Sequence, residues 1–245
     1  MIKIPAVIIS TPNSERLLPL IDKLSATNTF EPILITATMG ENLKLPSEYE
    51  TKKELENYGR TLTQNERACA ISHTQARGII AESPIGGIIF EDDARILDLL
   101  SLEKSTVDFL LKYGETYSAL GVVQYSRFKK VSRPSFQIPR FRRLLSEVPL
   151  AVATVLTKNA ARKLTESASS GSQIADWPSS GCKYYFLAPG CVRHGDESSG
   201  TVIGDSSTRI LGNYPPILTR QGIKLRQKRL LQKLDTHIIS YHQSK

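Results

Sequence analysis

The sequence predicts an α/β fold with a mostly parallel central sheet. Short apolar runs rich in β-branched residues alternate with segments whose apolar residues recur at helical spacing. Residues 4–36 hold a strand, a helix and a strand in that order, and units of this kind form parallel sheets. A later apolar run at 88–90 ends in three adjacent carboxylates. Ligands of open α/β sheets bind at such strand ends.

The first three elements are marked by composition and by breaking residues. The IPAVII run at 4–9 predicts a strand, which the sequence STPNS ends. Residues 15–24 have apolar side chains at helical spacing, and Ser14 is expected to cap this helix. The PILIT run at 32–36 predicts the second strand.

The next helix is expected at 62–81. Thr63 followed by Glu66 forms a capping-box pattern, and alanine and isoleucine side chains give the segment one apolar side. Two glycines then lead into the strand at 88–90, so the three carboxylates follow its C-terminal end.

The second half of the chain is less regular. The basic segment 127–143 has no acidic residue and contains prolines, so we expect a loop there, and 176–209 reads as loop-rich. We expect one domain over 1–212 and a basic amphipathic helical tail over 213–245. The remaining elements are expected as a helix near 107–112, strands near 120–125 and 148–156, and a helix at 160–167.

Composition narrows the possible partners. The net charge of +8 favours an anionic one: nucleic acid, a phosphate-rich substrate or an acidic membrane surface. The three cysteines form no CxxC pair, so we expect a reducing compartment, with neither a disulfide framework nor a zinc site. The N-terminus has the wrong flanks for a signal peptide, and no apolar run is long enough to span a bilayer.

The acidic triplet, Glu91, Asp92 and Asp93, is the strongest candidate site. Adjacent carboxylates repel and are costly to desolvate, so a positive partner is expected. Side-by-side oxygen ligands suit Mg²⁺ or Mn²⁺, which are often held by one or two carboxylates and by substrate phosphates. The alternative is a solvated strand end or a helix cap.

The spacing of several motifs resembles glycosyltransferase family 25, which includes bacterial lipooligosaccharide glycosyltransferases. The resemblance spans roughly residues 1–210 and is more specific than any one motif. Departures occur at Asn65, at Arg67-Ala68 and at Met39, where the family usually has Gly, Ile-Gly and Asp. The matching residues are Ser14-Glu15-Arg16, Leu62, Glu66, Cys69, Ala70, Ser72, His73, the acidic triplet and Ala175-Asp176-Trp177.

The resemblance implies a GT-A-like, Rossmann-type nucleotide-sugar-binding fold. It implies metal-assisted, inverting transfer of a hexose, expected to be galactose, from a UDP-sugar to a lipooligosaccharide or other surface glycan. Glu91 and Asp93 would hold Mn²⁺ or Mg²⁺, while Asp92, or else the first acid, would hold ribose or sugar hydroxyls. An inverting transfer needs a base, for which Asp176 is the candidate; a turn or cap residue beside Pro178 is the alternative.

Other site candidates each have a structural alternative. Ser14 and Arg16 are expected near the donor, although Arg16 also suits an exposed helix face. Ser72 and His73 are expected to line the donor pocket, although a buried histidine often serves only to pack two helices. His194 is a candidate last metal ligand or else part of a surface loop.

The two basic segments indicate where the protein works. Together they favour docking on an anionic membrane, peripheral at the cytoplasmic face of the inner membrane, next to a lipid-linked acceptor. The tail could instead pack on the core. A catalytically silent glycan-binding relative and a Mg²⁺-dependent nucleic-acid-binding protein remain as rivals. Because the sequence has no nucleic-acid-binding signature, we do not expect nucleic acid as a partner.

Overall fold

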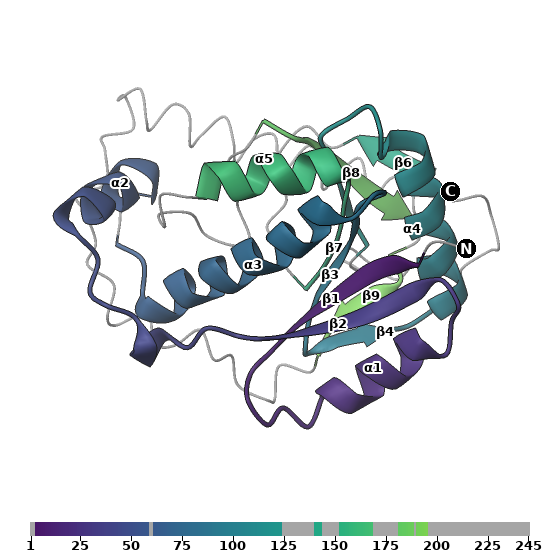
Figure 1. Cartoon of the computed structure of the whole chain (residues 1–245), viewed down its shortest axis with the longest axis horizontal. Helices are drawn as coiled ribbons and strands as arrows, with labels where there is room; N and C mark the ends of the chain where they lie inside the picture. Colours follow the sequence, from purple (N-terminus) through teal and green to yellow (C-terminus); the bar gives the residue numbers. More distant parts are fainter. Residues whose placement is uncertain are drawn as a thin grey trace, which may run out of the picture.

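The structure is a mixed α/β domain built on one seven-stranded sheet (Figure 1). It is a computed structural model that describes residues 3–58, 61–123, 140–143, 152–168, 181–188 and 190–195. The sheet order is β2-β1-β3-β7-β5-β8-β6. Its strands are β1 Ile4–Ser10, β2 Phe30–Thr36, β3 Gly87–Glu91, β5 Ala119–Val122, β6 Arg140–Arg143, β7 Ala153–Leu156 and β8 Lys183–Ala188.

Strand directions confirm the mostly parallel sheet. β1 pairs parallel with both β2 and β3, and β5 pairs parallel with β8. β7 is antiparallel to β3 and β5, and β6 is antiparallel to β8. All the strands except β6 and β7 therefore run in one direction. A separate two-stranded ribbon pairs β4 Ala94–Ile96 with β9 Val192–His194.

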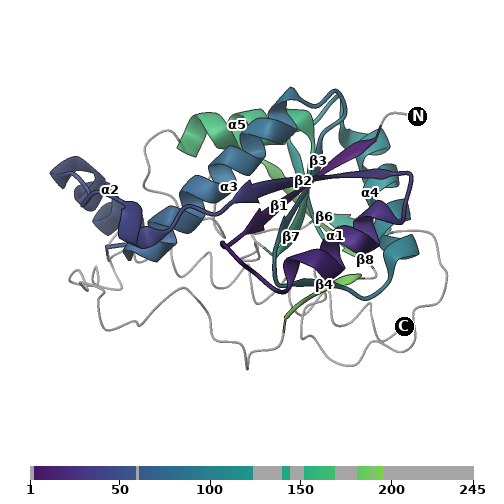
Figure 2. The same ribbon diagram turned by 60° about the horizontal axis from the view of Figure 1, so that its bottom comes forward.

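Helices cover both faces of the sheet. Figures 1 and 2 show α3 and α5 side by side over one face, whereas α1 and α4 lie over the other. α2 lies at the N-terminal end of α3, away from the sheet. The helices are α1 Leu17–Ser25, α2 Glu48–Tyr58, α3 Gln64–Glu82, α4 Leu99–Tyr113 and α5 Lys158–Ala168, with a 3₁₀ turn η1 Gly40–Asn42.

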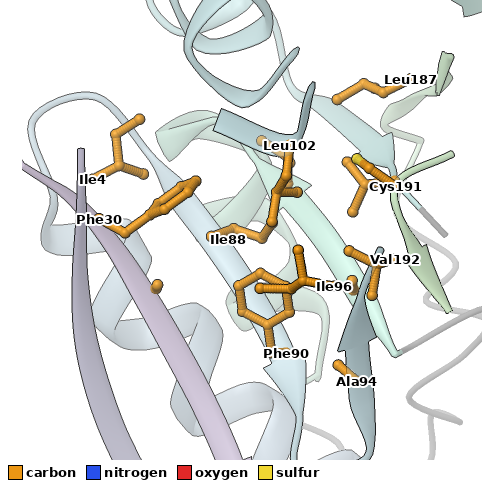
Figure 3. Close-up of a cluster of buried hydrophobic side chains, with 14 of the residues drawn as sticks. Ile4, Phe30, Ile88, Phe90, Ala94, Ile96, Leu102, Leu187, Cys191 and Val192 are labelled. Atoms are coloured by element: carbon orange, nitrogen blue, oxygen red, sulfur yellow. The ribbon is translucent and has the colours of Figure 1, made fainter. Parts of the chain in front are cut away.

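Two apolar clusters follow from the alternation of side chains along the strands. Ile8 and Phe90 point to the α1/α4 face, while Ile9 and Ile89 point to the α3/α5 face. Both faces are buried, which explains why β1 and β3 are continuously apolar. Figure 3 shows the first cluster, where β1, β2 and β3 meet α4 and the β4–β9 ribbon.

Most predicted elements of the first half are confirmed. β1, β2, α3 and β3 lie where expected, and Thr63 and Glu66 form both bonds of the capping box. The predicted Ser14 cap is wrong, because Arg16 occupies the N-cap position and makes no side-chain cap bond. Gly86 has φ +102°, and a Cβ there would overlap the Leu156 carbonyl oxygen, so this turn needs glycine.

The structure differs more from the predictions in the second half of the chain. The segment 127–143 is not all loop, because it contains β6, and 176–209 contains β8 and β9. β5 ends at Val122 and β7 begins at Ala153, inside the predicted ranges 120–125 and 148–156, and α4 is longer than predicted. The C-terminal helical tail, Asp176 and Trp177 lie outside the described residues, so these predictions stand untested.

A buried ion pair fixes α2 against α3. The Glu54 carboxylate has no exposed surface and accepts from Arg67 Nε and Nη2, both at 2.7 Å. It also accepts from the Leu62 backbone N–H at 2.8 Å. Three donors therefore converge on one buried carboxylate, and they link α2, the following loop and the first turns of α3.

We predict that Glu54→Ala lowers the free energy of unfolding by about 3–5 kcal/mol, because it leaves the mostly buried Arg67 guanidinium without its partner and the Leu62 N–H without its acceptor. Chemical denaturation measures this change. Glu48→Ala at the exposed start of α2 is the control and should change stability by less than about 0.5 kcal/mol. Equal losses for the two variants would contradict the prediction.

Cys191 belongs to the core rather than to the surface (Figure 3). Its side chain is 1% exposed, and burial raises the pKa of the thiol to about 12. Because this pKa is raised in the folded state, the thiol contributes stability that is present below about pH 9 and is lost between pH 9.0 and about 12.

We predict that iodoacetamide at pH 8 labels Cys69 and Cys182, which are partly exposed, at least about tenfold faster than Cys191 in the folded chain. The reagent attacks the thiolate, which Cys191 does not form at this pH. Mass spectrometry of peptides gives the three rates. In denaturant the rates should converge, and a persistent difference there would assign the protection to local sequence rather than to burial.

Candidate functional site

The site lies where β1 and β3 end side by side. Their parallel register pairs Ile9 with Glu91, so Ser10, the last residue of β1, and Thr11, which follows it, lie next to Asp92. Carboxyl ends of parallel strands are where open α/β sheets bind ligands. The prediction that the acidic triplet lies at the C-terminal end of a buried strand is therefore confirmed, with Glu91 as the last residue of β3.

Asp92 joins the two strand ends. One carboxylate oxygen, Oδ2, accepts from Ser10 Oγ at 3.3 Å and from the Thr11 N–H and hydroxyl at 3.2 Å each. Asp92 is only 9% exposed, so these three donors compensate much of the cost of burying its charge. The contacts fix the start of the β1–α1 loop, which carries Ser14 and Arg16.

Glu91 faces α3. Its Oε1 lies 3.1 Å from His73 Nε2, and the Glu91 side chain is 25% exposed against 4% for His73. The predicted donor-site histidine is thus buried and in contact with the first acid of the triplet. Glu91 thus contacts the buried imidazole of His73 while part of its own side chain remains exposed to solvent at the end of β3.

Ser72 connects α3 with the residues that follow β2. Its hydroxyl accepts from the Thr38 N–H at 2.8 Å and donates to the Ala68 carbonyl at 2.9 Å. The side chain is 1% exposed. These bonds give Ser72 a positioning role at this edge, and its predicted contact with a donor remains a prediction.

The third acid adjoins the β4–β9 ribbon. Asp93 directly precedes β4, and the antiparallel register places His194 opposite Ala94. A Cβ on Gly195 would lie 3.0 Å from the Asp93 carbonyl oxygen, so the two segments approach closely. The backbone thus brings residue 194 to the triplet from more than ninety positions away, and a ligand role for His194 remains a prediction.

The loop between β1 and α1 holds the other two candidates. Asn13 adopts a positive φ of 62°, and Ser14 follows it with a buried hydroxyl oxygen. Within the described ranges no group hydrogen-bonds to this oxygen. Arg16 is the residue before α1 and is partly exposed. Both residues therefore sit on the loop that Asp92 holds.

The structure also brings together a set that sequence patterns alone did not reveal. Ligand atoms of Cys69, His73 and Glu91 all lie within 4.8 Å of one another. Cys69 and His73 are four residues apart on α3, so they project from the same side of the helix. The C-x₃-H spacing is the signal of this set in the sequence, and it differs from the CxxC pairs that are typical of zinc sites.

The departures from the family pattern lie at contacts of the N-terminal half of α3. A Cβ on Gly40 would overlap Asn65 Oδ1 and lie 2.8 Å from the Asn65 backbone nitrogen. Arg67 pairs with the buried Glu54 carboxylate of α2. Asn65 and Arg67 thus have local packing partners that are distinct from the triplet's own contacts.

Comparison with known proteins identifies the family. The family model described as "Glycosyltransferase family 25 (LPS biosynthesis protein)" matches residues 4–176, more than two thirds of the chain. The chain belongs to this family. It is therefore a glycosyltransferase of lipopolysaccharide biosynthesis, which uses a nucleotide-sugar donor and a glycan acceptor. The match includes β1, α3, the acidic triplet and, at its end, Asp176.

No curated protein matches this family 25 glycosyltransferase. Across the ranges that the structure describes, no helix is long and apolar enough to cross a membrane.

We predict that Asp92→Ala lowers the free energy of unfolding by about 1–3 kcal/mol, because it leaves the Thr11 N–H without its acceptor at a partly buried position. Thermal and denaturant unfolding measure the loss. Asp22→Ala, on the exposed side of α1, is the matched control and should stay within about 0.5 kcal/mol of the parent. An Asp92 variant as stable as this control would show that the linkage is energetically neutral.

Proposed function

We propose that this enzyme moves a hexose, galactose, from a UDP-sugar to a lipooligosaccharide or related surface glycan. The transfer inverts the anomeric carbon and is assisted by Mn²⁺ or Mg²⁺, on a GT-A-like domain over 1–212. The observation that carries the proposal is the acidic triplet at the adjoining ends of β1 and β3. Family membership supports the reaction class, and the nucleotide, sugar and stereochemistry rest on the resemblance in sequence.

The chemistry of the donor set fits a hard cation. Glu91 and Asp93 both offer carboxylate oxygens, the ligands that Mg²⁺ and Mn²⁺ prefer. Glu91 is accessible enough to reach a bound ion, whereas Asp92 has one oxygen committed to Ser10 and Thr11. We therefore assign Glu91 and Asp93 as ligands, with His194 as a further candidate. Such a cation, when bound, neutralises charge on the leaving diphosphate.

The chain's own residues would position the donor. Asp92 holds the loop that carries Ser14 and Arg16, so the Ser14 hydroxyl can donate to a nucleotide or sugar oxygen and Arg16 can pair with a phosphate. The other carboxylate oxygen of Asp92, Oδ1, would accept from a ribose or sugar hydroxyl. Ser72 and His73 support this edge from α3. Asp176 remains the proposed base that takes the proton from the acceptor hydroxyl.

The two basic segments support a proposal for where the enzyme is located in the cell. Residues 127–143 and the tail 213–245 are rich in Lys and Arg, and each basic residue near an anionic leaflet contributes about 1 kcal/mol of binding. We propose that they dock the enzyme at the cytoplasmic face of the inner membrane, beside a lipid-linked acceptor.

The deciding experiment is calorimetric titration with UDP in the presence of Mn²⁺ and in the presence of EDTA. We expect the affinity for UDP to fall at least about tenfold in EDTA and in Asp93→Ala, because the charge of the diphosphate is then uncompensated. Asp22→Ala, far from the triplet in sequence and exposed, should bind like the parent.

Binding of UDP that is unchanged by EDTA and by Asp93→Ala would contradict the metal assignment. A folded enzyme that binds no UDP would contradict the choice of nucleotide and would favour a silent relative. Salt-dependent DNA binding in that sample would favour the nucleic-acid rival.

A further inference from the structure

We propose that Cys69, His73 and Glu91 form a binding site for Zn²⁺ or a similar borderline cation. This cysteine-histidine-glutamate site differs in ligand chemistry from the carboxylate pair assigned to the donor cation. The two sets share Glu91, so we expect Zn²⁺ to compete with the donor cation, and this part of the proposal rests on the proposed function. Its core claim, that the chain binds Zn²⁺ through Cys69, does not.

The three ligand atoms lie near enough to one another for side-chain rotations to place them around one ion. Zinc bonds of about 2.0–2.3 Å in a tetrahedron place ligand atoms roughly 3.3–3.8 Å apart. His73 Nε2 and Glu91 Oε1 already lie 3.1 Å apart, and all three ligand atoms lie within 4.8 Å of one another. Small rotations of the Cys69 and Glu91 side chains, which are both only partly buried, would bring the three ligand atoms to the spacing of a zinc site.

The scaffold holds two ligands in place before any ion binds. Cys69 and His73 lie one turn apart near the middle of α3, and the helix packs against β1 and β3. His73 is 3% exposed, so its ring has little freedom to turn away from Glu91. Prearranged ligands reduce the ordering that binding requires.

The ligand types select the ion. Thiolate and imidazole favour Zn²⁺ over Mg²⁺ and Mn²⁺, which prefer oxygen ligands. A thiolate and a carboxylate together balance the charge of a divalent ion. Three protein ligands also leave a fourth position, which in zinc sites of this kind is taken by water or by a ligand oxygen.

The shared carboxylate couples the two sets. A Zn²⁺ ion held by Cys69 and His73 would keep Glu91 at α3, where it already contacts His73, and so withhold it from the donor cation. If the donor cation uses Glu91 as we propose, Zn²⁺ should weaken Mn²⁺-dependent UDP binding in the parent and have less effect in Cys69→Ala.

The test begins with Zn²⁺ alone, titrated into the full chain without nucleotide and followed by calorimetry. We expect Cys69→Ala to lower the affinity for Zn²⁺ at least about tenfold, while Cys182→Ala, which removes the other partly exposed cysteine, leaves it unchanged. Co²⁺ provides a spectroscopic probe, because thiolate coordination gives a charge-transfer band that should be absent only from Cys69→Ala.

A measurement on the unmutated chain removes any dependence on how the variants fold. Bound Zn²⁺ should slow alkylation of Cys69 at least about tenfold and leave Cys182, an internal control, unaffected. Equal alkylation rates with and without Zn²⁺, or Zn²⁺ affinity unchanged in Cys69→Ala, would overturn the site.

The two proposals fail separately. Cys69-dependent Zn²⁺ binding in a chain that binds no UDP would keep the zinc site and reject the donor assignment. Mn²⁺-dependent UDP binding in a chain that binds no Zn²⁺ would do the reverse.

Discussion

The site depends on the parallel pairing of β1 with β3 and on the carboxylate of Asp92, the residue that directly follows β3. Backbone hydrogen bonds bring the two strands to the same edge, and Asp92 then accepts from three donors of Ser10, the last residue of β1, and Thr11, the first residue beyond it. A buried charge of this kind is tolerated only when donors surround it. The position of the β1–α1 loop, and with it that of Ser14 and Arg16, therefore follows from one side chain at the end of the neighbouring strand.

Local sequence predicted the elements that bury both faces of the sheet. β1, β2 and β3 are apolar runs with clear breaks, and α3 has a capping box, so spacing and composition were sufficient. The strands β6, β8 and β9 were missed for a physical reason. Arg140–Arg143 has no strand pattern of its own and is ordered by pairing with β8, which lies about forty positions away. β9 has only three residues, and its partner β4 is equally short.

The candidate site was predictable to a similar extent. The acidic triplet was found because a strand end followed by carboxylates has a direct chemical meaning. The contact of His73 with Glu91 was not predicted from the sequence, since it depends on how α3 packs across the sheet. Cys69 was not predicted as a ligand because zinc sites were sought as paired cysteines, whereas here a helical turn and a neighbouring strand supply the set. Tertiary proximity, rather than residue type, was the missing information.

Helix α3 also limits how the chain can change length. Arg67, Ser72 and His73 contact α2, the residues after β2, and β3 in turn, so three partners are matched to fixed angular positions on one helix. Each inserted residue rotates the downstream part of a helix by about 100° and moves it about 1.5 Å along the axis. An insertion between Arg67 and Ser72 would thus point His73 away from Glu91 while Arg67 kept its partner. Length variation among relatives should accordingly be confined to the loops, with the spacing inside this helix kept constant.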